Sequence, residues 1–239
     1  MSRDRLYFLL RKLHSLTGIV PIGIFLLVHL FLNCGALLGE CNFTEGVRTI
    51  NMMPYVHYIE VFGIIVPLAF HGLLGLWMVF VQARYNNASY TYSRNWWYTA
   101  QRLTGLLIFV FLCWHLWDTV LAKLMGQITL EQFYQHLLRG MSSDMLFLAM
   151  FVVGTVAASF HLANGAWGFC ASWGVLQSRK AQRVGAWAFG LAGAALFAVW
   201  LNVIMHFASG GPVGPDNWIP VQEPPLDCGA TLLADISER

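Results

Sequence analysis

Four histidines, each inside a long apolar stretch, are the residues of this chain best suited to do chemistry: His29, His71, His115 and His161. An imidazole is costly in the hydrocarbon of a membrane, so an intramembrane histidine indicates a functional site for which a partner must be named. A neutral imidazole ligates transition metals and also relays protons. The alternative for each ring is a hydrogen bond to a neighbouring carbonyl or hydroxyl group. That alternative weakens when four histidines form two matched pairs.

An internal repeat matches the histidines. Those at positions 71 and 161 each begin an HxxxGxW motif. The other two each follow a Leu-Thr-Gly triplet, by 11 residues from Gly18 to His29 and by 10 residues from Gly105 to His115. The first two apolar segments therefore resemble the next two. In an up-down-up-down bundle, alternate helices are parallel and diagonal, and their axes lie about 11–14 Å apart, which leaves room for a flat macrocycle between facing imidazoles.

Depth separates the two pairs. Counted from the basic boundary of the apolar segments at about 1.5 Å per residue, His29 and His115 lie about 27 Å deep, whereas His71 and His161 lie about 18–20 Å deep. Two imidazoles on opposite sides of a plane suit low-spin haem iron, and a chain without a CxxCH motif binds haem noncovalently as type b. Zinc usually has three or four protein ligands and fits two histidines less well. The pattern therefore predicts two haem b groups and an electron path across the membrane.

Gly75 and Gly165 lie one helical turn from the histidines of their HxxxGxW motifs, on the same face. A residue without a side chain at this place lets a large ring approach the backbone, so both are candidate haem-binding residues. The alternative is the ordinary packing of small residues between membrane helices.

The elements that must position these residues are membrane helices. The chain has 239 residues, 57% hydrophobic and 11% charged, with a mean hydropathy of +0.58, whereas soluble domains are about 25% charged. This composition excludes a soluble globule, a nucleic-acid-binding protein, a secreted disulfide scaffold and a disordered chain. We predict an all-α integral membrane protein whose first four spans form an up-down-up-down bundle around two haems. The five predicted spans are 13–37, 57–83, 101–124, 144–172 and 184–208.

The basic residues predict the orientation. The N-terminal segment and the segments 84–102 and 173–183 together hold ten of the fourteen Lys and Arg, including Arg84. By the positive-inside rule the N-terminus is cytoplasmic and the C-terminus is outside. We expect a five-helix haem domain over residues 1–208 and a Pro- and Gly-rich extracytoplasmic tail over 209–239. A disulfide among Cys34, Cys41 and Cys228 is compatible with that side of the membrane but does not follow from the sequence.

Glu60, Asn33 and Asp118 are candidates for a quinone site, because a two-haem membrane protein needs a lipid-soluble electron donor or acceptor. In a regular α-helix the 11 residues from Glu60 to His71 turn about 20° past three full turns, so both side chains face the bundle interior. Asn33 and Asp118 each lie one turn outward of the histidine in their own helix. We expect Glu60 to accept the proton. The alternative is a hydrated interfacial carboxylate.

A second polar group gathers near the inner ends of the spans. It could pair with haem propionates or with an acidic partner, and the alternative is a set of topology determinants. Its members are Arg11, His14, Ser15, Arg102 and Arg183. Three further histidines lack repeat partners and receive no role: His57, His136 and His206.

Taken together, these motifs resemble the large cytochrome b subunit of the di-haem succinate dehydrogenase/fumarate reductase family, the five-helix membrane anchor of the b558 type. The resemblance runs from about residue 5 to about 208. It rests on Arg11-x-Leu13-His14-Ser15-Leu16 with Gly18, His29, Glu60…Pro67…His71, Tyr92-Ser93-Arg94-Asn95-Trp96, Gln101-Arg102-Leu103-Thr104-Gly105, Trp114-His115 and His161-x-x-Asn164-Gly165-x-Trp167.

The resemblance implies that His71 and His161 bind the proximal, higher-potential haem and that His29 and His115 bind the distal one. It also implies a cytoplasmic flavoprotein subunit with covalent FAD, an iron–sulfur subunit on the inner face and menaquinone as the quinone, in the cytoplasmic membrane of a bacterium. Such an anchor passes electrons between the quinone and these subunits and does not itself bind succinate or fumarate. The tail after residue 208 departs from the family pattern.

Two alternatives stay open. The same haem chemistry suits an anchor of another respiratory enzyme, such as a hydrogenase. A protein of a different class, a haem-free transporter or scaffold, would use the histidines to relay protons. The direction of the reaction, succinate oxidation or fumarate reduction, does not follow from these residues.

Overall fold

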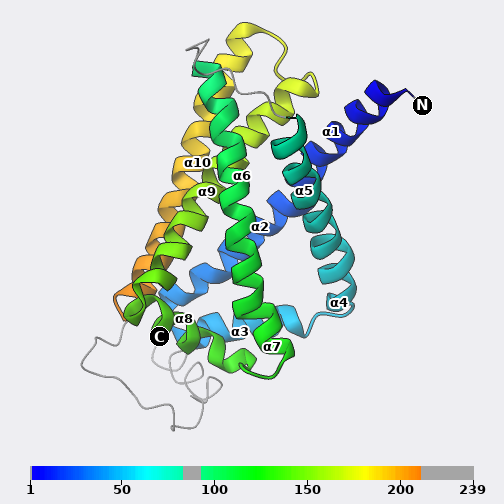
Figure 1. Ribbon diagram of the computed structural model, residues 1–239. Helices are drawn as coiled ribbons and strands as arrows, with labels where there is room; N and C mark the ends of the chain where they lie inside the picture. The colour runs from blue at the N-terminus through cyan, green and yellow to red at the C-terminus, as the bar shows by residue number, and fades with distance from the viewer. Residues whose placement is uncertain (1, 83–92, 211–239) are drawn as a thin grey trace. The chain divides into compact units, whose positions relative to one another are not determined.

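The computed structural model describes residues 2–82 and 93–210, and these ranges form helices joined by short turns and contain no strand (Figure 1). Five helical segments are long and apolar enough to cross a membrane, as predicted: Arg3–Leu38, Val56–Val81, Asn95–Leu124, Met145–Ser172 and Arg179–Ala208. Large apolar side chains along them are exposed, including Phe31, Phe62 and Leu73. Exposure of this kind fits a lipid surrounding rather than water.

The first three spans are interrupted helices. In the first, Pro21 starts a new helix because it has no N–H and its ring clashes with the preceding turn, whereas the sequence pattern indicates one helix there. The span consists of α1 (Arg3–Ile19), α2 (Pro21–Asn33) and η1 (Cys34–Leu38). The second consists of α4 (Val56–Tyr58), the π-helical stretch η2 (Ile59–Ile65), α5 (Val66–Trp77) and a second π-helical stretch, η3 (Met78–Gln82). The third consists of α6 (Ser93–Leu116), the π-helical η4 (Trp117–Leu121) and α7 (Ala122–Leu124).

The fourth and fifth spans are the continuous helices α9 (Met145–Ser172) and α10 (Arg179–Ala208). Three spans begin five or more residues earlier than predicted, at residues 3, 95 and 179 rather than 13, 101 and 184. A helix can continue past the edge of the hydrocarbon, because its backbone hydrogen bonds do not depend on apolar side chains. Arg84, Cys228 and nearly all of the predicted tail lie outside the described residues, and Cys34, Cys41, Cys113 and Cys170 carry free thiols.

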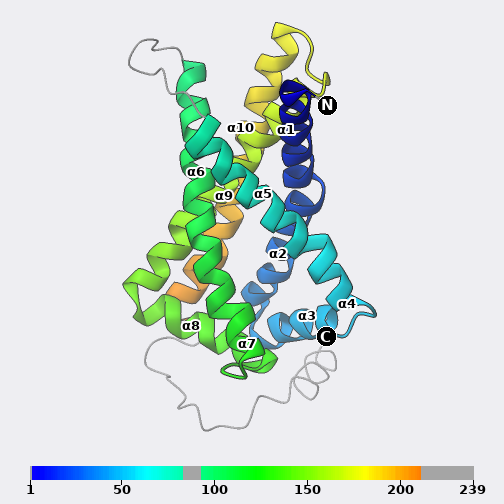
Figure 2. The ribbon, with the colours of Figure 1, turned by 45° about the vertical axis from the view of Figure 1, so that its right-hand side comes forward.

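The helices contribute to two compact units. The first unit comprises Met1–Leu27, His57–Leu112 and Val153–Ala198. In it α1 packs along α5 (Figure 2), and small residues bring other helices together. A Cβ added to Gly154 would lie 2.5 Å from Cγ of Phe111, and one added to Gly193 would lie 2.6 Å from Cβ of Ala163. Close approach at small residues is typical of membrane helix packing.

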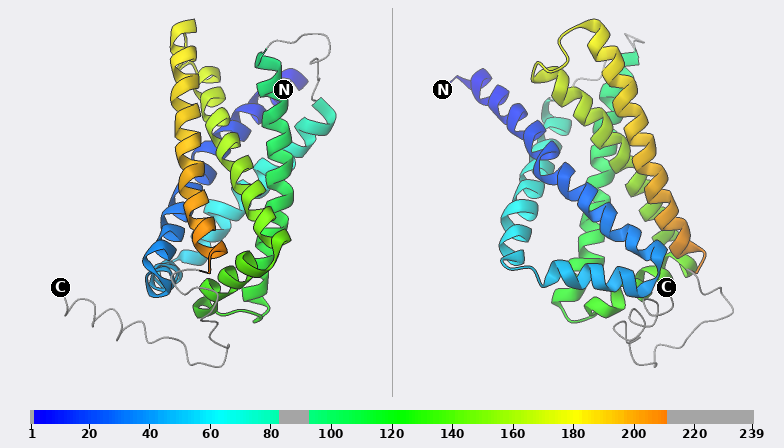
Figure 3. Two further views of the ribbon diagram at one scale, coloured as in Figure 1. Left: turned by 90° about the vertical axis from the view of Figure 1, so that its left-hand side faces the viewer. Right: turned by 180° about the vertical axis from the view of Figure 1, so that it is seen from behind.

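The second unit comprises Val28–Val56, Cys113–Val152 and Val199–Arg239. Two helices that the hydropathy pattern does not predict, α3 (Glu40–Asn51) and α8 (Phe133–Ser143), pack against each other in it, and the short η5 (Leu130–Gln132) leads into α8 (Figure 3, right). Both are amphipathic and too short to span a membrane. Their apolar faces meet α10, where the ring centroids of Phe43 and Tyr134 lie 6.1 and 5.3 Å from that of Phe207.

Polar groups on these two helices are paired. Nε2 of Gln135 donates to Oε2 of Glu40 at 2.7 Å, and Arg48 contacts carboxylate oxygens of Glu45 and Glu131 at 3.1 and 3.5 Å. Burial raises the pKa of Glu40, although the bond from Gln135 opposes the shift. Burial also raises the pKa of Tyr134 to about 12. The paired side chains hold α3, η5 and α8 in one layer of the second unit.

Candidate functional site

His71, on α5 in the first unit, is oriented by the backbone of α1. Its Nδ1 lies 2.9 Å from the carbonyl oxygen of His14. A carbonyl oxygen can only accept, so Nδ1 carries the proton and donates it. The second nitrogen, Nε2, then has the lone pair that a metal ion binds. Histidines that ligate metals are usually oriented by such a bond from their other nitrogen.

His161, on α9 in the same unit, has the equivalent bond. Its Nδ1 lies 3.0 Å from the carbonyl oxygen of Gln101 on α6 and 3.3 Å from Oγ1 of Thr104. Gln101 occupies the repeat position of His14, since each lies four residues before the glycine of a Leu-Thr-Gly triplet. The internal repeat is therefore a repeat of structure, with each histidine ring held by the matched carbonyl of the preceding span.

Glycines let each pair of helices approach closely, in a reciprocal way. A Cβ added to Gly18 would lie 2.5 Å from Cε1 of His71, and one added to Gly105 would lie 3.0 Å from Cε1 of His161. In return, Cε1 of His14 would lie 3.3 Å from a Cβ added to Gly75. The matching atom on the other side of the repeat is Nε2 of Gln101, at 3.3 Å from a Cβ added to Gly165.

Gly75 and Gly165 are thus faced by a side chain of the preceding span. Each makes room for the residue whose carbonyl holds the adjacent histidine. Their predicted role in letting a haem approach the backbone stays a prediction.

The two halves of the repeat differ in the side chain at the matched position. In one half the imidazole of His14 stacks on that of His71, with ring centroids 3.8 Å apart and 11° between the planes. In the other half the amide of Gln101 forms a clamp on α9. Its Nε2 donates to the carbonyl oxygen of His161 at 3.1 Å, and its Oε1 accepts from Nδ2 of Asn164 at 2.7 Å. Sequence reasoning missed both arrangements.

The structure brings His71 and His161 together, with ring centroids 6.3 Å apart and planes at 80°. A ring nitrogen lies about 2.0 Å from a bound first-row metal ion and about 1.1 Å from the centre of its own ring, so an ion between two imidazoles places the ring centres about 6.2 Å apart. Edge-to-face packing without a metal suits a similar separation. The Nδ1 bonds to carbonyl groups favour metal ligation over packing alone, because they leave a free lone pair on Nε2 of both rings.

His29 and His115 also come together, in the second unit. Their ring centroids lie 6.1 Å apart with 71° between the planes. Aromatic side chains surround them: the ring of Trp200 lies 5.9 Å from that of His29, and the ring of Phe151 lies 5.7 Å from that of His115. The separation equals that of the other pair within 0.2 Å, so the same fit to an iron between two imidazoles holds here. Within the described ranges no three His, Cys, Asp or Glu side chains converge on a metal position.

The predicted propionate-binding residues make local contacts in the first unit. Ser15 donates to the carbonyl oxygen of Lys12 at 2.9 Å and accepts from Nε1 of Trp173 at 3.2 Å. The guanidinium groups of Arg11 and Arg102 lie over the rings of Tyr7 and Tyr98. Lys12 also donates to the carbonyl oxygen of Ser172. These contacts hold the cationic groups of Arg11 and Lys12 on α1 and that of Arg102 on α6.

The predicted quinone-site residues lie in both units. In the first unit Glu60 contacts Nδ1 of His57 at 3.2 Å and retains 40% of its side-chain exposure. Glu60 falls in η2, so the α-helical count that placed it on the face of His71 is interrupted by π-helical turns.

The other two predicted quinone-site residues belong to the second unit. Asn33 donates to the carbonyl oxygen of His29 at 2.7 Å, and its Nδ2 lies 3.5 Å from Nε2 of that ring. Asp118 lies 2.9 Å from Nε2 of His136. The sequence assigns no role to His136, because nothing in its spacing connects it with Asp118.

Comparisons with known proteins show the family of the chain. Residues 85–200 match the family model described as "Succinate dehydrogenase/Fumarate reductase transmembrane subunit". The chain is also 34% identical over 207 residues to the "Succinate dehydrogenase cytochrome b558 subunit" of Bacillus subtilis (strain 168). That alignment covers 87% of this chain and 100% of the relative. The chain therefore belongs to the family of succinate dehydrogenase/fumarate reductase transmembrane subunits.

Proposed function

We propose that this chain is the membrane anchor and di-haem cytochrome b subunit of a succinate:quinone oxidoreductase, in the cytoplasmic membrane of a bacterium. It carries electrons between a quinone, which we take to be menaquinone, and the FAD and iron–sulfur clusters of two cytoplasmic partner subunits. Family membership supports the enzyme complex. The single observation that carries the haem proposal is the matched pair of Nδ1–carbonyl bonds at His71 and His161.

The chain's own residues determine how two haems are held. His71 and His161 would ligate one iron through Nε2, and His29 and His115 would ligate the other. A bound haem b supplies a one-electron carrier whose iron alternates between the ferric and ferrous states. The carbonyl groups of His14 and Gln101 keep the first two rings in the ligating tautomer. Arg11, Ser15 and Arg102 stay candidates for propionate contacts at the basic ends of α1 and α6.

The distribution of charge supports an orientation with the N-terminus in the cytoplasm. In that orientation the His71–His161 pair is the inner one and faces the partner subunits, and the His29–His115 pair is the outer one. The basic segments on the inner side suit an acidic docking surface on a partner. The quinone reacts on the outer side in this proposal, where Asn33 and Asp118 lie one turn beyond the outer histidines and Glu60 accepts a proton.

A reduced-minus-oxidised spectrum of the purified complex tests the proposal. We expect two b-type α-bands and a stoichiometry of two haems per chain, together with co-purification of a flavin-containing subunit. Absence of both bands eliminates the cytochrome and favours a haem-free proton relay. Two bands with a different soluble partner, such as a hydrogenase subunit, would retain the haem anchor and reject the succinate complex.

Glu60→Gln tests the proton acceptor separately. An amide keeps the size of the side chain but cannot take up a proton, so we expect quinone turnover to fall at least a hundredfold. Both haem spectra should stay unchanged, because Glu60 is not one of the four proposed ligands and its carboxylate contacts His57. Glu45→Gln, at a carboxylate paired with Arg48, is the matched control and should retain turnover. Normal turnover in Glu60→Gln would remove this residue from the proposal.

A further inference from the structure

We propose that the second unit binds the quinone ring in a small aromatic cavity, and that the neighbouring His136–Asp118 pair exchanges a proton with a quinone oxygen. The inference rests on the proposed function, since it presumes that a quinone reacts beside the His29–His115 pair. It adds a ring-binding cavity and a proton-exchanging imidazole to that function. The internal sequence repeat predicts neither of these two features.

The pair has the geometry of an oriented base. Nε2 of His136 on α8 lies 2.9 Å from Oδ2 of Asp118, and the two side chains retain only 28% and 19% of their exposure. A carboxylate accepts the proton of Nε2, so a neutral His136 has its lone pair on Nδ1. This is the arrangement by which a carboxylate holds an imidazole in the tautomer that accepts a proton. Asp118 itself lies in η4, a π-helical stretch, and such stretches occur frequently at functional sites.

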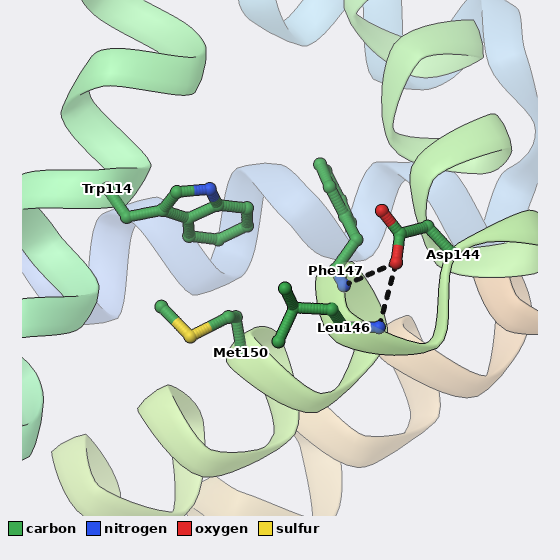
Figure 4. Close-up of a pocket in the computed structure, with 5 residues that line it drawn as sticks. All are labelled: Trp114, Asp144, Leu146, Phe147 and Met150. Carbon is green, nitrogen blue, oxygen red and sulfur yellow. Dashed lines mark hydrogen bonds between the residues drawn. The ribbon is translucent and has the colours of Figure 1, made fainter.

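The cavity lies beside α9 and has a volume of about 180 Å³ (Figure 4). Trp114, Leu146, Phe147 and Met150 give it an apolar and aromatic lining. Asp144 also lines it, but its Oδ1 accepts from the backbone N–H groups of Leu146 and Phe147 at 2.8 and 3.2 Å. That oxygen of Asp144 therefore caps the start of α9.

The size and position of the cavity suit a quinone head group. A dry cavity of about 150 Å³ binds benzene, so about 180 Å³ suits the ring of a quinone but not its isoprenoid tail. Leu146, in the cavity wall, retains 71% of its surface. In a membrane that exposed surface contacts lipid, and the tail can leave the cavity on this side.

Aromatic rings connect the cavity with His136, the proposed proton donor, and with His115, a proposed haem ligand. The ring centroid of Phe147 lies 5.9 Å from that of His136 and 5.1 Å from that of Trp114. On the other side, Phe147 packs on Phe151 at 5.2 Å, and Phe151 contacts His115. The Phe147 side chain therefore lies between a ring in the cavity and His136. Trp114, the residue before His115, forms part of the cavity wall.

The reaction balances in either direction. Reduction of the quinone to the quinol takes two protons and two electrons, which bound haems would supply one at a time. His136 does not line the cavity, so it supplies one proton to a quinone oxygen through water beside the Phe147 ring and recovers it from outside water. Glu60, the proton acceptor of the proposed function, exchanges the other. In the reverse direction bound haems would accept the two electrons of the quinol, and both protons leave along the same routes.

Variants in the intact complex separate proton exchange from binding. His136→Gln keeps a donor for Asp118 but cannot act as a base, so kcat for quinone turnover should fall at least tenfold while KM changes less than threefold. Asp118→Asn should behave alike. Met150→Trp fills the cavity and should raise KM at least tenfold. Met145→Trp, at a residue 81% exposed and outside the cavity lining, is its control. Both haem α-bands should be unchanged in all four.

A photoreactive naphthoquinone provides a readout that does not depend on turnover. We expect it to label residues 144–150 in the unaltered complex and in His136→Gln, and to lose this labelling in Met150→Trp. Labelling confined to another segment, or wild-type kcat in both His136→Gln and Asp118→Asn, overturns the inference. The proposed function stays intact in that case, provided that the unaltered complex turns over quinone. An unaltered complex without haem or quinone turnover rejects the proposed function itself.

Discussion

Replacing His161 with leucine is expected to remove one of two haems and leave the other in place. Leucine fills the volume of the imidazole but has no lone pair, so iron at this level would keep only His71 as a ligand. The other pair belongs to the second compact unit and shares no ligand with the first. The purified variant should therefore contain one haem per chain and show a single α-band, measured by pyridine haemochrome and redox titration.

The remaining ligands provide the comparison. His71→Leu should lose the same α-band as His161→Leu, and His29→Leu and His115→Leu should both lose the other one. His57→Leu, at a side chain that is 85% exposed, should retain two haems. Retention of both bands in His161→Leu, or loss of different bands in His71→Leu and His161→Leu, would contradict the pairing.

Gly18→Ala is expected to displace a haem ligand without removing it. The new Cβ would lie 2.5 Å from Cε1 of His71, which is far inside van der Waals contact. The ring cannot turn away without stretching its 2.9 Å bond to the carbonyl oxygen of His14. Overpacking of this kind costs about 1–3 kcal/mol. We expect loss of that haem, or a shift of its midpoint potential, together with a lower thermal unfolding temperature.

Alanine substitutions at two further glycines should show smaller effects on the haem and on stability than Gly18→Ala. Gly105→Ala should act in the same direction but less strongly, because its Cβ would lie 3.0 Å from Cε1 of His161. Gly168→Ala is the control, since no atom lies within 4 Å of its added Cβ, and alanine stabilises a helix by about 1 kcal/mol relative to glycine. Equal potentials and equal unfolding temperatures in all three variants would show that close approach at Gly18 does not position the ligand.

The sequence predicts the helices and the histidine pairs well because both depend on patterns along the chain. Apolar length defines the five spans, and the HxxxGxW repeat matches His71 with His161. The repeat also indicates where the residues that anchor the histidine rings lie, because His14 and Gln101 both stand four residues before a glycine. Sequence spacing alone could not show the anchors themselves, since the accepting atoms are backbone carbonyl oxygens that every residue has.

Other features depend on contacts that have no local signature. The helices α3 and α8 are too short and too polar for a hydropathy search, and only their apolar faces, with residues such as Phe43 and Tyr134, distinguish them from loops. The contact between Asp118, in the third span, and His136, in α8, joins two segments whose sequence patterns are unrelated. In contrast, the break at Pro21 could have been predicted, because proline cannot continue a helix. The π-helical turns around Glu60 could not, since no residue type specifies them.

The backbone anchors at His71 and His161 have a consequence for how the inner carrier, which both rings are proposed to ligate, can be tuned. A carbonyl oxygen survives any substitution that keeps the helix, so ligand orientation is insulated from the identity of the side chain at positions 14 and 101. Those two side chains then act as independent adjustment points, one an imidazole stack and the other an amide clamp. Exchanging them between the halves of the repeat offers a route to retune one carrier without loosening its ligands.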